Sequence, residues 1–182
     1  MSSTALYILR LCVTLFLITA LVAGALAGVN AITEDRIAAA KAEKQQAAIQ
    51  EVLAGVTDFG ELALTGDTGI VTAVYSCDKG YAVKVSPSGF GGPIDMMVGI
   101  DTEGNVLGIS IISQTETAGL GAVAAAKNSA GVAFREGFVG QNGTVTIGKG
   151  EDQVDGLSGA TITSVAIADG VNAALEYVRN LG

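Results

Sequence analysis

The sequence predicts an α+β domain attached to a single N-terminal transmembrane helix. An uncharged apolar run covers Leu11–Val29, and short runs rich in β-branched residues follow between Gly66 and Ile112, separated by turn residues. Helical spacing of apolar residues returns in 122–130 and 162–179. Because short strands joined by tight turns pair antiparallel, we expect a largely antiparallel sheet with flanking helices.

The composition excludes several classes of function. The 182-residue chain has 18 acidic and 10 basic residues, and no cluster of Lys or Arg offers a face to a nucleic acid. Histidine is absent, which excludes a Ser-His-Asp or Cys-His mechanism and removes the commonest metal ligand. Cys12 and Cys77 lie too far apart to build a disulfide framework or a metal site within one copy. Chemistry must therefore come largely from a cofactor.

The uncharged run is long enough to cross a membrane. Leu11–Val29 has nineteen residues, which as a helix would span roughly 28 Å, close to the ~30 Å hydrocarbon core of a bilayer. A cleaved signal peptide is the alternative, because Ala25-Leu26-Ala27 fits a small-x-small cleavage site, but the run exceeds the usual apolar region of such peptides. We therefore predict a retained transmembrane helix over 11–29.

Charges on either side of this helix predict its orientation. Arg10 is the only charge before the helix, and Glu34 and Asp35 follow it. The positive-inside rule then places residues 1–10 in the cytoplasm and residues 30–182 outside.

Residues 30–55 form the predicted connection to a domain over 56–182. Ala31–Ala54 is rich in Ala, Gln, Glu and Lys, which are good helix formers, and Gly55 is a stop signal. This helix either continues the membrane helix outward or packs as a first surface helix. A solvated stalk and a partner-binding helix are equally compatible with its composition.

The predicted sheet begins with a hairpin around Asp78-Lys79-Gly80. Further strands follow the Gly-rich loop 86–93 and the turn 101–105, and a helix is expected over 122–130. The predicted strands are Val71–Ser76, Tyr81–Val85, Ile94–Ile100, Val106–Ile112 and the short Val145–Ile147.

The most informative stretch is Asp155–Ser164, in which small and hydroxyl residues come directly before the last predicted helix and at its start. That helix has apolar residues at helical spacing, namely Val165, Ala168, Val171, Leu175 and Val178. The start of a helix offers unpaired N–H groups and the positive end of the helix dipole, so Thr161 could carry or contact a phosphate. The alternative is that Ser158 or Thr161 only caps the helix.

The motif Ser158-Gly159-Ala160-Thr161, with Asp155-Gly156 before it, resembles the flavinylation motif of the FMN-binding domain family. Members of that family include the G subunit of Rnf complexes, which are ion-translocating ferredoxin:NAD oxidoreductases, and the C subunit of the sodium-translocating NADH:quinone reductase. The resemblance implies FMN joined by a phosphoester to Thr161, with Ser158, Gly159 and Ala160 beside the phosphate.

Two further motifs resemble the same family in the same order. Phe90–Ile94 resembles its Gly-Gly-Pro loop, and Glu116–Gly121 matches Glu-Thr-Pro-Gly-Leu-Gly except for Ala118 in place of Pro. Gln114 stands where members often carry His. The resemblance implies that this loop lines the isoalloxazine ring, with Glu116 and Thr117 as polar contacts and Leu120 as packing.

Two other features leave alternatives open. Lys149 could approach the phosphate or the ring, or be an ordinary exposed lysine. Gly119–Ala124 also spells G-x-G-x-x-A, with Glu136 at a suitable distance for a ribose, which would indicate a dinucleotide site if it lay in a parallel βαβ unit.

The resemblance implies a membrane-anchored flavoprotein that relays electrons within an Rnf-type complex and has no independent catalytic reaction. A flavin transferase using FAD is the first partner implied, and other membrane subunits are the lasting ones. The alternatives are a C-subunit-like component of the quinone reductase and a cofactor-free anchored binding or scaffold module.

Overall fold

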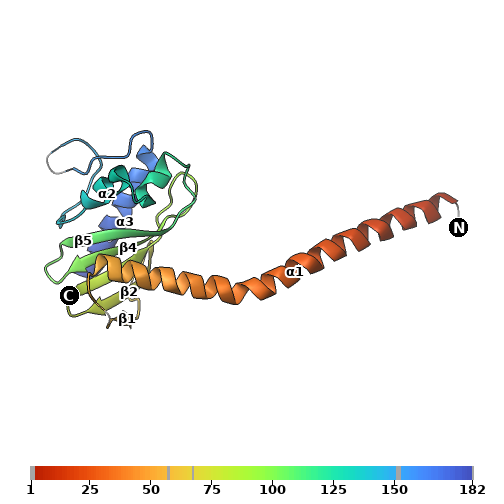
Figure 1. The fold of residues 1–182 in the computed structure, drawn as a ribbon, viewed down its shortest axis with the longest axis horizontal. Helices are drawn as coiled ribbons and strands as arrows, with labels where there is room; N and C mark the ends of the chain where they lie inside the picture. The colour runs from red at the N-terminus through yellow and green to blue at the C-terminus, as the bar shows by residue number, and fades with distance from the viewer. Residues whose placement is uncertain (1–2, 57, 67, 151–152, 182) are drawn as a thin grey trace. The chain divides into compact units, whose positions relative to one another are not determined.

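The computed structural model describes residues 3–56, 58–66, 68–150 and 153–181, which divide between two compact units, Met1–Glu43 and Lys44–Gly182 (Figure 1). The first unit is helical and contains the first part of α1 (Ser3–Val52). Apolar side chains along it, from Leu6 to Ile37, are exposed. Among the described residues, α1 is the one helix long and apolar enough to cross a membrane.

The second unit is built on a five-stranded sheet in the order β1-β2-β3-β4-β5, with every neighbouring pair antiparallel. Gly80, which has φ of +140°, follows the tight turn of the predicted hairpin. The predicted α+β class and the four main strands are confirmed, whereas β1 was not predicted. The strands are β1 (Gly60–Leu62), β2 (Val71–Cys77), β3 (Gly80–Val85), β4 (Asp95–Asp101) and β5 (Val106–Ser113).

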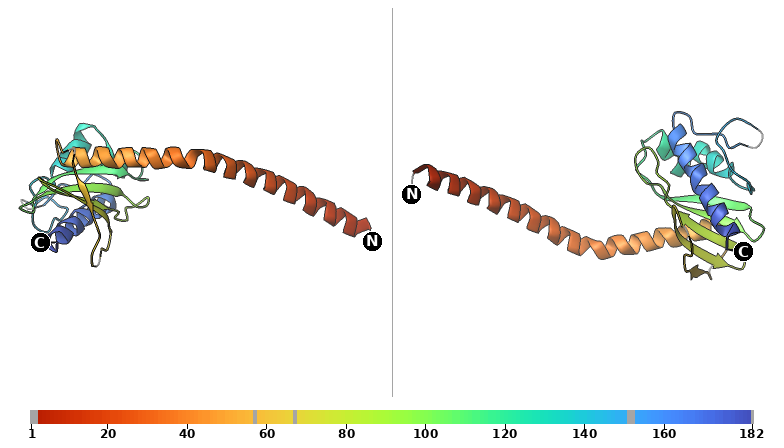
Figure 2. Two further views of the ribbon diagram at one scale, coloured as in Figure 1. Left: turned by 90° about the horizontal axis from the view of Figure 1, so that it is seen from below. Right: turned by 180° about the vertical axis from the view of Figure 1, so that it is seen from behind.

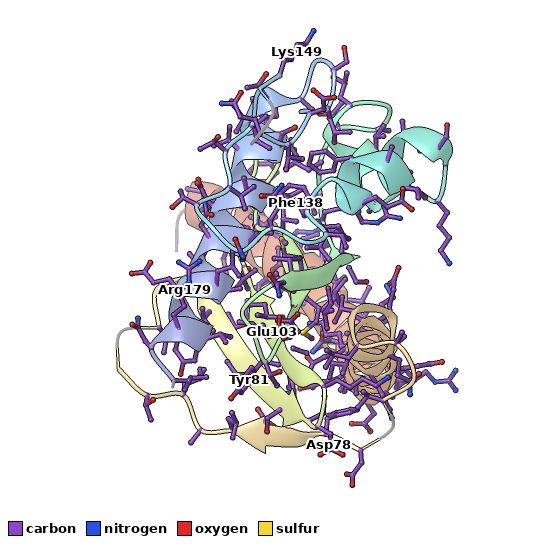
Figure 3. The ribbon with its side chains drawn as sticks, turned by 90° about the vertical axis from the view of Figure 1, so that its left-hand side faces the viewer. Asp78, Tyr81, Glu103, Phe138, Lys149 and Arg179 are labelled. Carbon is purple, nitrogen blue, oxygen red and sulfur yellow. The ribbon has the colours of Figure 1, made fainter. Side chains whose placement is uncertain are left out.

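Helices cover both faces of this sheet. Side chains alternate between the two faces along each strand, so each face presents apolar residues to the helix that covers it. Val83 and Val98 face α3 (Thr161–Arg179) in the larger core, which also contains the fully buried Phe138 (Figure 3). Ala82 and Met97 face the last turns of α1 in a second, smaller core. Figure 2 shows the last turns of α1 and the helix α3 on opposite sides of the strands.

The compact unit begins at Lys44, earlier than the boundary at residue 56 predicted from the sequence. Ile49 and Leu53 are 1% and 0% exposed, so the end of the predicted connecting helix belongs to the core of the domain. Gln45 also donates a hydrogen bond to the Tyr75 hydroxyl at 2.6 Å. Burial, together with the nearby Glu61, raises the pKa of Tyr75.

Two predicted elements of the chain differ in the structure. The helix expected over 122–130 is a 3₁₀ helix η1 (Gly121–Ala125) followed by a separate α2 (Ser129–Glu136), because the Asn128 side chain accepts from the Gly131 N–H and starts a new helix. The strand predicted at Val145–Ile147 is wrong, since only Ile147 makes an isolated bridge, with Val154.

Candidate functional site

Three segments that are distant in the sequence meet at the N-terminal end of α3 and enclose a cavity of about 340 Å³. They are the Gly-rich loop before β4, the loop between β5 and η1, and the turn that enters α3. A volume of this size lies at the lower end of the range for small-molecule sites. The lining residues are Phe90, Glu116, Thr117, Leu120, Gly121, Gly159, Ala160, Thr161, Ile162 and Thr163.

The first turn of α3 has no side-chain cap. Ala160 occupies the N-cap position, and in the described part of the chain the N–H groups of Thr161, Ile162 and Thr163 have no hydrogen-bond acceptor. The interpretation of Ser158 or Thr161 as a simple cap is therefore wrong. Three free N–H donors and the positive end of a 19-residue helix make this turn suited to an anion.

The local sequence explains why this turn is open. Gly159 adopts φ of +73°, a conformation that favours glycine, immediately before the helix begins. The Ser164 hydroxyl is fully buried, donates to the Ala160 carbonyl at 3.0 Å and accepts from the Leu157 N–H at 2.9 Å. Ser164 thus fixes the turn from inside and leaves the outward N–H groups free.

Thr161 lies at the mouth of this site. Its side chain is exposed, and its hydroxyl makes no hydrogen bond to any residue that the structure describes. Thr161 also lines a second cavity of about 300 Å³, together with Val165 and Asp169 from the following turns of α3. A nucleophilic oxygen is therefore presented between two hollows at the start of the helix.

Glu116 holds the three segments together. It is 9% exposed, and its Oε1 accepts from the Gly91 N–H at 2.8 Å while its Oε2 accepts from the Thr163 hydroxyl at 2.5 Å. Gly121 packs directly against this pair, because a methyl group there would lie 2.5 Å from Thr163 Oγ1. The carboxylate thus joins the Gly-rich loop to α3.

Exposed apolar side chains form the outer walls of the cavity. Phe90 is 69% exposed, Ile162 57% and Leu120 43%, and the Leu120 side chain lies against Gly159. Large apolar side chains left open around a hollow typically mark a binding site. A flat apolar ring would cover them.

The structure brings most of the predicted site residues together. Thr161, Gly159, Ala160, Glu116, Thr117 and Leu120 all line the 340 Å³ cavity. Ser158 lines a different cavity of about 400 Å³ next to α2. Lys149 is exposed, projects from one end of the domain (Figure 3) and does not line the site.

Sequence reasoning did not assign four of the lining residues. Phe90 and Gly121 lie within motifs that were identified, and the Glu116–Gly121 loop was predicted to line the ring, but neither residue was given a role of its own. Ile162 and Thr163 follow Thr161 directly, and helical geometry places Thr161 and Thr163 about 200° apart around the axis. That rotation is the signal that could have predicted one exposed and one buried threonine.

A larger cavity of about 460 Å³ lies at the opposite end of α3, beside Tyr177 and Asn180. The carbonyl end of a helix disfavours anions, so this cavity is poorly suited to a phosphate. The dinucleotide interpretation of Gly119–Ala124 is also wrong. The sheet is antiparallel throughout, and Gly121 starts a five-residue 3₁₀ helix rather than the helix of a βαβ unit.

Comparisons with known proteins agree with this geometry. Residues 89–176 match the FMN-binding domain family, and residues 1–52 match the RnfG N-terminal region. The C subunit of the Na(+)-translocating NADH-quinone reductase from Parabacteroides distasonis has a similar fold, with a TM-score of 0.54 and 23% identity over 78% of this chain and 92% of that one.

Relatives that match over nearly the whole chain identify the family more specifically. The G subunit of the Na(+)-translocating ferredoxin:NAD(+) oxidoreductase complex of Acetobacterium woodii is 31% identical, covering 96% of this chain and 93% of the relative. The G subunit of the ion-translocating oxidoreductase complex of Methanosarcina acetivorans is 30% identical, covering 94% of each. The chain therefore belongs to the family of G subunits of ion-translocating oxidoreductase complexes, whose C-terminal part is an FMN-binding domain.

Proposed function

We propose that this chain is the membrane-anchored electron-relay subunit of an Rnf-type ion-translocating oxidoreductase complex, with FMN esterified to Thr161. One observation carries the proposal: at the start of α3, beside an apolar-walled cavity, an exposed hydroxyl and three N–H groups have no hydrogen-bond partner among the residues that the structure describes. FMN, when bound, supplies one- and two-electron redox chemistry.

The residues of the site fit both ends of FMN. Each N–H group of Thr161–Thr163 that donates to a phosphate would contribute about 1.5–3 kcal/mol, and the helix dipole about 0.3–1 kcal/mol more. These terms favour an anion here even though the chain carries a net charge of −8. Phe90, Leu120 and Ile162 would keep water from the apolar ring.

Thr161 is proposed to acquire the cofactor from FAD through a flavin transferase. Its Oγ would form a bond to the phosphorus of the FMN moiety, the diphosphate bond of FAD would break, AMP would leave, and the hydroxyl proton would be released. Lys149 is given no contact with the bound cofactor, because it is exposed and does not line the 340 Å³ cavity.

The anchor and the charges around it support the remaining parts of the proposal. The exposed apolar surface of the first part of α1 suits a lipid environment, and Arg10 before it with Glu34 and Asp35 after it favours a cytoplasmic N-terminus. The domain would then be extracytoplasmic and would contact other membrane subunits. The relatives include one named Na(+)-translocating and one, from Clostridium ljungdahlii, named proton-translocating, so we propose no particular ion.

Two alternatives receive less support. The likeness to the C subunit of the quinone reductase concerns the fold, whereas G subunits match this chain over nearly its whole length. A cofactor-free scaffold would leave the open first turn of α3 without a purpose.

Covalent attachment can be tested by co-expressing the chain with a flavin transferase. Intact-mass measurement and flavin fluorescence on a denaturing gel should show one FMN on the native protein and none on Thr161→Ala. Thr144→Ala, which removes another exposed threonine hydroxyl, should keep the flavin. Flavin retained by Thr161→Ala would contradict the assignment.

A further inference from the structure

Four hydroxyl side chains lie in or next to the first turn of α3, so the site must select one of them. We propose that Glu116 makes this selection by sequestering Thr163, which leaves Thr161 as the reachable threonine. The inference rests on the proposed attachment of FMN and assigns Glu116 a positioning role in it. Direct contact of Glu116 with the ring is not required.

The two threonines differ in surroundings rather than in chemistry. Thr161 is exposed and its hydroxyl is unpartnered among the described residues, whereas Thr163 is 2% exposed and donates to Glu116 Oε2 at 2.5 Å. The Glu116 side chain cannot swing aside freely, because its Oε1 also accepts from the Gly91 N–H. Gly121 closes the other side of the Thr163 hydroxyl.

The chemistry of attachment makes this difference decisive. The acceptor oxygen must approach the phosphorus of a dinucleotide as the O–P bond forms, the diphosphate bond breaks, AMP leaves and the hydroxyl proton departs. At Thr163 the phosphate would meet the Glu116 carboxylate, which blocks the approach and repels the negative charge. At Thr161 the approach is open.

The other two hydroxyls are excluded by position. Ser164 is 0% exposed and already makes two hydrogen bonds within the turn. Ser158 is exposed but lines the cavity next to α2 and does not line the cavity beside Thr161 and Thr163. Thr163, in contrast, lines the same cavity as Thr161, so removing the Glu116 side chain should open that cavity to its hydroxyl.

The experiment uses the full-length chain co-expressed with a flavin transferase. The proteins compared are the native chain, Thr161→Ala, Thr161→Ala with Glu116→Ala, and that double variant with Thr163→Val added. Peptide mass spectrometry locates the flavin, and circular dichroism checks folding. A purely structural role for Glu116 would lower yield or stability, but it would not move the label to another residue.

The native chain should carry FMN on Thr161, and Thr161→Ala should carry none. The double variant should carry FMN on Thr163, at a level at least about tenfold above the detection limit that bounds Thr161→Ala, because a blocked approach typically costs a large factor in rate. The triple variant should lose it again. If Glu116→Ala prevents folding, Glu116→Gln keeps the side-chain volume, removes the charge and should give intermediate labelling.

Two outcomes would overturn the inference: flavin on Thr163 in Thr161→Ala alone, or no flavin on Thr163 in any folded double variant. The second outcome would mean that the transferase, and not Glu116, determines which threonine receives the flavin. Failure of the proposed function is separate, because the native chain would then carry no flavin at all.

Discussion

Gly121→Ala should disrupt the contact that holds the site together. The added methyl group would lie 2.5 Å from Thr163 Oγ1 and 2.6 Å from Glu116 Oε2, well inside ordinary van der Waals contact. Gly121 has no positive φ, so backbone strain does not contribute. Overpacking of this kind costs about 1–3 kcal/mol, and weakening a hydrogen bond to a charged group adds about 1.5 kcal/mol or more.

The sum is about 3 kcal/mol, which for a domain of this size should lower Tm by roughly 10 °C. Gly143→Ala is the matched control, because nothing lies within 4 Å of the added methyl group and Gly143 has no positive φ. Its stability should change by about 0.5 kcal/mol or less. Thermal unfolding followed by circular dichroism in detergent measures both. A Tm for Gly121→Ala within about 2 °C of the control would refute the reasoning.

Three further predictions follow from the fold and the anchor. A fragment over 44–182 should unfold cooperatively, whereas a fragment over 56–182 should be strongly destabilised. The shorter fragment loses Ile49, Val52 and Leu53 from the smaller core, at about 1.5–3 kcal/mol of unfolding free energy each. Equal Tm values for the two fragments would place these residues outside the cooperative unit. Hydrogen bonds from Asn105 and neighbouring N–H groups lower the pKa of Asp101. The ionised Asp101 side chain therefore stabilises the folded state above its ordinary pKa of about 4, and this contribution is lost as pH falls through the lower pKa of the folded state. Asp101→Asn should therefore reduce Tm at pH 7 and flatten its fall in acid, as thermal melts between pH 2 and 7 would reveal, and an unchanged acid slope would contradict this. Protease added to intact spheroplasts should digest the domain, and complete protection of the domain would place it in the cytoplasm.

Local patterns in the sequence were sufficient to predict much of the fold. The β2–β3 hairpin followed from two strand-like runs around Asp78-Lys79-Gly80, and α3 followed from helical spacing. The three-residue β1 carries too little pattern to be recognised. The prediction of one helix over 122–130 was wrong because the Asn128 side chain caps the start of a new helix. Whether that capping hydrogen bond forms depends on the local backbone path, which the sequence does not give.

The candidate site was predicted in its parts but not in its connections. The motifs located Thr161 and the Glu116–Gly121 loop, yet the hydrogen bond between Glu116 and Thr163 joins residues 47 positions apart. Val165 appeared in the apolar stripe of α3, but it is 42% exposed and lines the second cavity beside Thr161. A single sequence contains the periodicity of a helix, whereas which residues face the sheet depends on how the helix packs.

The proposed covalent attachment would place two conflicting requirements on this site, and the start of α3 could satisfy both. A covalent tether needs a hydroxyl open to solvent, while a cofactor ring needs walls that do not move. Residues two positions apart in an α-helix point about 200° apart around its axis. Thr161 can therefore face outward while Thr163, in the same turn, is fixed to the core. The hydrogen bond that buries Thr163 is also the bond that attaches the Gly-rich loop to the helix through Glu116. Rigidity of the cavity and selection of the acceptor would therefore depend on the same carboxylate, so a substitution of Glu116 should affect both together.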